Sequence, residues 1–226
     1  MSGPASDSWR EEDLHAWHVL GPLLVQGGYL PWTTGSMRPA GLVAVCNEIV
    51  HGSRTRILEC GSGVSTVVLA RLLRERHAGG LIALEHDRHW AALVQDHLRR
   101  ETLDTIARVL HAPLQGEPPW YGLAGLEEVP DQVDLLVVDG PPACDPGHGT
   151  RRAPALSEFA EQLVVGATVV LDDINRPGER KVIASWEAST DWRFVADERA
   201  GVAIGRRDTD VRGSKGYGQD TPESCV

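Results

Sequence analysis

Short apolar runs alternate with longer amphipathic stretches from residue 56 to residue 205 of the chain. We predict strands at 56–60, 81–85, 107–111, 133–139 and 167–172, and helices at 9–25, 40–50, 65–77, 88–101, 154–163 and 179–188. Strands that alternate with helices predict a parallel sheet with helices on both of its faces. The last two predicted strands, 192–196 and 201–205, have no helix between them, so we expect one of them to run antiparallel at the end of the sheet.

The 226 residues are enough for one α/β domain with its own core. Because two helices are predicted ahead of the first strand, residues 9–50 should form a helical cap on a single domain that spans residues 9–206. Residues 1–8 and 207–226 are small and polar, which is typical of disordered ends.

Composition and charge exclude several classes of protein. The formal net charge is −10, which argues against a nucleic-acid partner, because a phosphate backbone needs a basic face. No apolar run approaches the length of a membrane span, and the first residues lack the basic and apolar regions of a signal peptide. The four cysteines, Cys46, Cys60, Cys144 and Cys225, form no CxxC pair and indicate free thiols. We therefore expect a cytoplasmic protein without a membrane partner.

A glycine-rich turn follows the first predicted strand. Gly61, Ser62 and Gly63 lie between this strand and the next helix, where glycines let the backbone approach a ligand closely. Thr66 stands where the dinucleotide-binding pattern requires a third glycine, and the carboxylate of Glu59 would repel a pyrophosphate. A cationic ligand such as the sulfonium of S-adenosylmethionine suits Glu59 better. An ordinary turn that binds nothing remains the alternative.

Glu85 ends the second predicted strand, about 20 to 25 residues after the turn. A carboxylate at this place can accept hydrogen bonds from the hydroxyls of a ribose. The alternative is a solvated strand end. The nearby turn favours the ribose role.

Several segments together resemble class I S-adenosylmethionine-dependent methyltransferases. Residues 57–66 are similar to motif I of the subgroup written E-x-G-S-G-x-S-T, and residues 83–87 to motif II. Residues 139–142 and 169–173, followed by Arg176, resemble the ends of strands four and five in this O-methyltransferase-like subgroup. The resemblance implies a Rossmann-like, mostly parallel sheet of seven strands with the last strand antiparallel, and S-adenosylmethionine as the cofactor.

The resemblance also implies a set of cofactor-binding residues. They are Glu59, Gly61, Ser62, Gly63, Thr66, Glu85, His86 and Asp139, with backbone groups near Ala112 for the adenine. Ser36 is a candidate for binding the cofactor carboxylate because it lies in the loop between the first two predicted helices, not because of the resemblance. The third strand departs from the family pattern, because His111 and Ala112 follow where many relatives have an acid.

Three acidic residues follow adjacent predicted strands. Asp139 ends the fourth strand, and Asp172 and Asp173 end the fifth, at the edge where open α/β sheets collect catalytic groups. We predict that these three are catalytic. Their arrangement resembles the metal-dependent catechol-type O-methyltransferases, which leaves a magnesium site open beside acid–base or structural roles.

The acceptor side of the site is predicted from loops near the same edge. Arg151, Arg152 and Arg176 indicate an anionic or carboxylate acceptor, unless they pair with the nearby acids. Trp32, Trp120 and Tyr121 are predicted in loops as walls of an acceptor pocket, unless they pack under the cap. Cys144 and His148 share a loop, but no nucleophile elbow supports a catalytic pair.

These observations predict methylation, at oxygen, of a small molecule or peptide. They leave a homodimer open. The other classes of function considered are a nicotinamide-dependent oxidoreductase, which Glu59 and Thr66 count against, and a cofactor-binding protein without catalytic activity.

Overall fold

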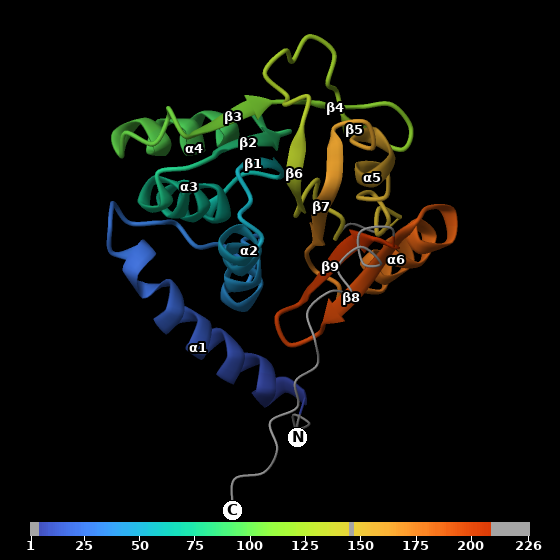
Figure 1. The fold of residues 1–226 in the computed structure, drawn as a ribbon, viewed down its shortest axis with the longest axis horizontal. Helices are drawn as coiled ribbons and strands as arrows, with labels where there is room; N and C mark the ends of the chain where they lie inside the picture. Colours follow the sequence, from blue (N-terminus) through green and yellow to red (C-terminus); the bar gives the residue numbers. More distant parts are fainter. Residues whose placement is uncertain (1–4, 145–146, 209–226) are drawn as a thin grey trace, which may run out of the picture.

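The computed structural model describes residues 5–144 and 147–208. Its centre is a seven-stranded sheet in the order β3-β2-β1-β6-β7-β9-β8 (Figure 1). The strands are β1 (Arg56–Cys60), β2 (Gly80–Glu85), β3 (Ala107–His111), β6 (Val133–Val138), β7 (Leu163–Leu171), β8 (Trp192–Asp197) and β9 (Val202–Arg207). The pairs from β3 to β7 are parallel, and β9 runs antiparallel to both of its neighbours. The predicted mostly parallel sheet with an antiparallel last strand is confirmed.

Helices cover both faces of this sheet (Figure 1). The helices are α1 (Ala5–Leu24), α2 (Pro39–His51), α3 (Val64–Arg76), α4 (Arg88–Arg100), α5 (Pro154–Glu158) and α6 (Pro177–Ser189). One core joins α1 to α4 with one face of the sheet, and a second core joins α5 and α6 with the other face. Along β6, Leu135 and Val137 enter the first core, whereas Leu136 and Val138 enter the second. This alternation follows from the two-residue period of a strand.

Three local predictions were wrong. The helix α5 ends at Glu158, because Leu163 already begins β7 and pairs with Val133 of β6. A short hairpin of β4 (Leu114–Gln115) and β5 (Trp120–Tyr121) stands where we predicted loops. Residues 5–8, predicted to be disordered, are the beginning of α1, and Arg207, also predicted to be disordered, is the last residue of β9. Strand pairing depends on residues that are distant in the chain, and a helix can extend past the residues whose pattern predicts it. A short sequence window shows neither effect.

Other expectations have separate outcomes. No helix in the described part of the chain is long and apolar enough to cross a membrane. Cys46, Cys60 and Cys144 are free thiols, as predicted, and Cys225 lies outside the described residues. The predicted disordered segments 1–4 and 209–226 also lie outside them.

A buried arginine ties the cap to the domain. Arg71 of α3 is fully buried and donates hydrogen bonds to the backbone carbonyls of Leu23, Leu24 and Gly28, at 2.9, 3.2 and 3.3 Å. The same guanidinium forms two hydrogen bonds of 2.8 and 2.6 Å with the carboxylate of Glu101, after α4. This clamp therefore fixes the segment that leads from α1 into the loop before α2.

Replacing this arginine should destabilise the whole domain. In Arg71→Met, the half-buried Glu101 carboxylate and the cap carbonyls lose the buried guanidinium, so the free energy of unfolding should fall by about 3–5 kcal/mol in urea denaturation. The control is Arg100→Met, which breaks an exposed ion pair with Asp96 and should cost less than about 1 kcal/mol. Equal losses in the two variants would contradict the clamp.

Candidate active site

The turn between β1 and α3 brings the backbone of two strands close together. Gly61 has a φ of +92°, a conformation that favours glycine, and its amide donates to the carbonyl of Leu84 at 2.9 Å. A Cβ at Gly61 would lie 3.2 Å from the amide nitrogen of Gly140, just after β6. Gly63 faces open space, with no atom within 4 Å of a Cβ placed there. The first glycine is thus required by packing, and the second leaves room beside the turn.

The buried Glu59 stabilises this turn through hydrogen bonds. Its Oε2 accepts a 2.6 Å hydrogen bond from the hydroxyl of Thr66, and that hydroxyl accepts a 2.9 Å hydrogen bond from the amide of Gly63. The Oε1 of Glu59 has no hydrogen-bond partner among the described residues. Burial raises the pKa of Glu59 to about 7, although hydrogen bonds from Ser65 and Thr66 oppose the shift. Neither Glu59 nor Thr66 lines the cavity next to the turn, so both act here on the shape of the turn.

A cavity of about 390 Å³ lies above the turn. Its walls are Thr33, Gly35, Ser36, Met37, Gly61, Ser62, Gly63, Val64, Ser65, Glu85, His86, Asp87, Trp90, Tyr121, Asp139, Gly140 and Pro142. Most of them come from the loop before α2 and from the carboxyl ends of β1, β2 and β6, the edge at which open α/β sheets bind ligands, and the others come from α3, α4 and β5. This volume is in the range of small-molecule sites.

Glu85 is a fixed carboxylate in the wall of this cavity. Its Oε2 accepts hydrogen bonds from the amide and hydroxyl of Ser62, at 3.0 and 3.1 Å. Its Oε1 accepts from the amide of Asp87 at 2.9 Å and lies 2.8 Å from Nδ1 of His86. Burial would raise the pKa of Glu85, but the hydrogen bonds from His86, Asp87 and Ser62 hold it below its ordinary value. Glu85 therefore remains an ionised acceptor at neutral pH.

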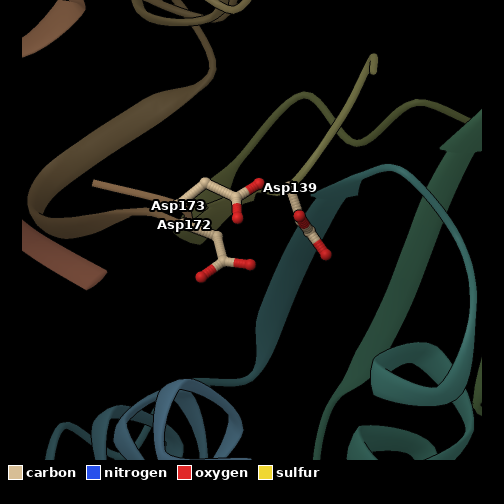
Figure 2. A group of neighbouring side chains, drawn as sticks. All are labelled: Asp139, Asp172 and Asp173. Atoms are coloured by element: carbon tan, nitrogen blue, oxygen red, sulfur yellow. The ribbon is translucent and has the colours of Figure 1, made fainter. Parts of the chain in front are cut away.

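The three predicted catalytic acids do meet at the strand ends (Figure 2). One carboxylate oxygen from each of Asp139, Asp172 and Asp173 lies within 4.8 Å of the others. Asp139 follows β6, and the other two follow β7. Asp173 has a φ of +64°, a left-handed conformation that places its carboxylate beside the other two.

An arginine lies within this acidic cluster. The Nη2 of Arg152 is 3.0 Å from Oδ2 of Asp173 and 3.3 Å from Oδ1 of Asp139, and the side chain is 3% exposed. Arg176 is 2.7 Å from the same Oδ2 of Asp173. Glu179 is nearly fully buried, with its Oε1 3.8 Å from Nη1 of Arg152. Two of the arginines predicted to bind substrate are therefore paired with acids.

Asp139 and Asp172 are neighbouring carboxyl groups, of which Asp172 is buried and Asp139 has a side chain that is 12% exposed. Burial raises the pKa of both, and the negative charges of the neighbouring carboxylates raise them further. Arg152 opposes the shift in each case. The two carboxyl groups therefore titrate as a coupled pair that holds a proton more readily than isolated carboxyl groups do, and such a pair can exchange a proton with a bound ligand.

The structure divides the predicted site residues into two groups. Those that line the cavity are Ser36, Gly61, Ser62, Gly63, Glu85, His86, Tyr121 and Asp139. Those that do not are Trp32, Glu59, Thr66, Ala112, Trp120, Arg151, Arg152, Arg176, Asp172 and Asp173. The second group includes three neighbours of Asp139 whose charges shift its pKa: Asp172, Asp173 and Arg152.

Three of the residues outside the cavity have other contacts. Trp32 packs against Trp17 of α1, with ring centroids 4.5 Å apart. This contact agrees with the alternative that Trp32 packs under the cap instead of forming a wall of an acceptor pocket. Trp120 is buried beside Tyr121. The amide of Ala112 donates to the carbonyl of Glu85 at 2.7 Å, so it is not free to bind an adenine.

Sequence reasoning missed Trp90, which lines the cavity from α4. Its Nε1 donates to the carbonyl of Ser62 at 2.8 Å, and so braces the glycine turn. Asp87 caps α4 by accepting the amide of Trp90 at 2.7 Å. The helix-capping pattern Asp-x-x-Trp, which begins two residues after Glu85, was the available signal, because it turns the tryptophan back toward the strand end.

The pH dependence of stability should report the buried Glu59. The folded state keeps a proton on Glu59 up to about pH 7, whereas the unfolded chain releases it near pH 4.5, so this carboxyl favours folding at low pH. Its contribution, on the order of 3 kcal/mol, is lost as the pH rises through 7. In Glu59→Gln, the free energy of unfolding should vary less between pH 4.5 and 7, as measured by urea denaturation. Glu128→Gln, an exposed glutamate, is the control and should keep the wild-type slope.

Comparisons with known proteins agree with this geometry. A family model described as a methyltransferase domain matches residues 58–174, more than half of the chain. Similar solved structures, at TM-scores of 0.61, 0.55 and 0.54, are the Podospora anserina methyltransferase PaMTH1 with SAH, the Bacillus cereus O-methyltransferase with SAH, and the O-methyltransferase TomG of Streptomyces achromogenes with SAM. They are 15%, 17% and 17% identical, and the matches cover 87%, 88% and 92% of this chain and 88%, 91% and 91% of theirs. No curated protein sequence matches the chain. The turn, the sheet order and the family match together show that the chain belongs to this family of methyltransferase domains.

Proposed function

We propose that the protein is an S-adenosylmethionine-dependent methyltransferase that methylates an oxygen atom of a small-molecule acceptor. The observation that carries the proposal is the cavity whose walls include the glycine turn, Glu85 and Asp139. A cofactor-binding turn and a carboxyl group suited to proton transfer thus share one space of small-molecule size.

The residues in the cavity fit this cofactor. Gly63 leaves open space next to the turn, and the buried hydroxyl of Tyr121 has no hydrogen-bond partner among the described residues. Glu85 can accept from ribose hydroxyls if the rotatable hydroxyl of Ser62 gives up its place on Oε2. Ser36, in the loop before α2, lies in the wall and can bind the cofactor carboxylate. When bound, the cofactor supplies an electrophilic methyl group.

Asp139 would take the proton that the acceptor hydroxyl loses during methyl transfer. A hydroxyl acceptor has to lose its proton during transfer, and the carboxyl group must lie within hydrogen-bond reach to take it. Asp139 is the member of the carboxyl pair that lines the cavity, and Asp172 stands behind it. The walls align the acceptor, which supplies a further part of the rate.

The class of acceptor is narrower than the sequence indicated. Arg152 and Arg176 are paired with acids, so an anionic acceptor would depend on Arg151. The Nε of Arg151 is buried without a hydrogen-bond partner among the described residues, while its Nη1 donates to the carbonyl of Pro142 in the cavity wall. We propose a hydroxyl-bearing acceptor, with a carboxylate substituent recognised by Arg151 as the more specific form. A peptide acceptor and a homodimer stay predictions.

The nicotinamide alternative finds no support at the turn. The hydroxyl of Thr66 occupies the place of a third glycine and is bonded to Glu59 and to the amide of Gly63. A dinucleotide pyrophosphate would need that amide, which the Thr66 hydroxyl already occupies. Titration with NADH, followed by fluorescence, should show no binding.

Glu85→Ala should weaken binding of S-adenosylmethionine by about 5- to 150-fold, or roughly 1–3 kcal/mol, because hydrogen bonds to a charged acceptor are lost. Isothermal titration calorimetry measures this, with the thermal unfolding of each variant recorded beside it. Glu128→Ala, at an exposed glutamate, is the matched control and should keep the wild-type dissociation constant. An unchanged constant in Glu85→Ala would refute the ribose role, and no binding by the wild type would refute the cofactor.

Asp139→Asn should lower kcat by about 10²- to 10⁴-fold while the dissociation constant of S-adenosylmethionine changes little. The wild type is first screened for methyl transfer to phenols, alcohols, carboxylates and peptides. The control Asp96→Asn changes an exposed acid far from the cavity and should retain activity. Full activity in Asp139→Asn would contradict the role of the carboxyl in proton transfer.

A further inference from the structure

We propose that the guanidinium of Arg152 takes the place of a divalent metal ion at the three acids, so that Asp139 is held by a cation built into the chain. This inference rests on the proposed function, since it describes how the catalytic carboxyl is positioned. It departs from the magnesium site that the resemblance to catechol-type enzymes leaves open.

The first support is the number of contacts that converge on this side chain. Nη2 of Arg152 donates to the carbonyl oxygen of Asp139 at 2.8 Å, and Nη1 donates to the carbonyl of Asp172 at 3.2 Å. Nε lies 3.4 Å from the carbonyl of Pro141. Together with the side-chain oxygens of Asp139 and Asp173, these acceptors connect the ends of β6 and β7. Arg152 therefore bridges the same strand ends that a metal ion would join.

The second support is that the carboxylate oxygens already have partners. Oδ2 of Asp173 is within ion-pair distance of both Arg152 and Arg176, at 3.0 and 2.7 Å. Oδ1 of Asp139 lies 3.3 Å from Nη2 of the same Arg152. A magnesium ion needs oxygen ligands at about 2.0–2.1 Å in octahedral geometry, so it would have to break these contacts.

The third support is the charge of the surroundings. A divalent cation among these oxygens would stand close to a guanidinium that is 3% exposed and is therefore weakly screened by water. The repulsion disfavours the ion, because the arginine cannot move into solvent without leaving Glu179 and the acids uncompensated. The planar fork of arginine reaches both strand ends, whereas the point charge of a lysine would not.

Metal binding to the ligand-free protein tests this inference directly. Isothermal titration with Mn²⁺ and thermal unfolding with millimolar Mg²⁺ are measured on the wild type and on Arg152→Ala. We expect no saturable binding and no magnesium-specific stabilisation in the wild type. Arg152→Ala should unfold at a lower temperature and regain part of the loss with Mg²⁺ but not with NaCl of equal ionic strength. The double variant Arg152→Ala/Asp172→Asn should lose that recovery.

The controls separate this arginine from a general structural role. Arg180→Ala breaks an ion pair with Glu198 on the surface and should show no magnesium effect. If Arg152→Ala does not fold, the same measurements on Arg152→Lys and the Mn²⁺ titration of the wild type still decide whether the three acids bind a metal ion. Stoichiometric Mn²⁺ binding by the wild type that is lost in Asp173→Asn would overturn the inference. Because no cofactor or acceptor is present, this result is independent of whether S-adenosylmethionine binds.

Discussion

The site depends on the hydrogen-bonded turn between β1 and α3. The hydroxyl of Thr66 joins the buried carboxyl of Glu59 to the amide of Gly63, and Trp90 braces the same turn from α4. These contacts fix the glycine backbone next to Gly140, which opens the cavity at the ends of β1 and β6. A buried acid below the turn thus stabilises its shape, and the cavity above it is left for a ligand.

The other half of the site follows from the sheet order. Because β6 and β7 are parallel neighbours, the acids after both strands arrive at the same edge. Four carboxyl groups gather there, counting Glu179, and two arginines compensate them. Burial and the neighbouring negative charges raise the pKa values of Asp139 and Asp172, while the positive charge of Arg152 offsets the repulsion among the carboxylates. The same arginine would hold Asp139 in position for chemistry.

Local sequence signals predicted some site residues better than others. Gly61, Gly63 and Glu85 belong to a turn and a strand end that short segments encode, and they lie in the cavity as expected. Arg152 and Arg176 are paired with acids, which is the alternative that the sequence left open, because their charge was visible in the sequence while their partners were not. Trp32 packs under the cap, and the cap position depends on the buried Arg71 clamp rather than on the residues near the tryptophan.

The sequence by itself determined the alternation of strands and helices, the antiparallel end of the sheet and the glycine turn. These are consequences of hydrophobic period and of backbone sterics, which act over a few neighbouring residues. Only the tertiary structure decided that Glu59 is sealed below the turn and that Arg152 stands among the acids. The charge and proton affinity of a side chain depend on burial and on partners distant in the chain, and the fold alone brings these together.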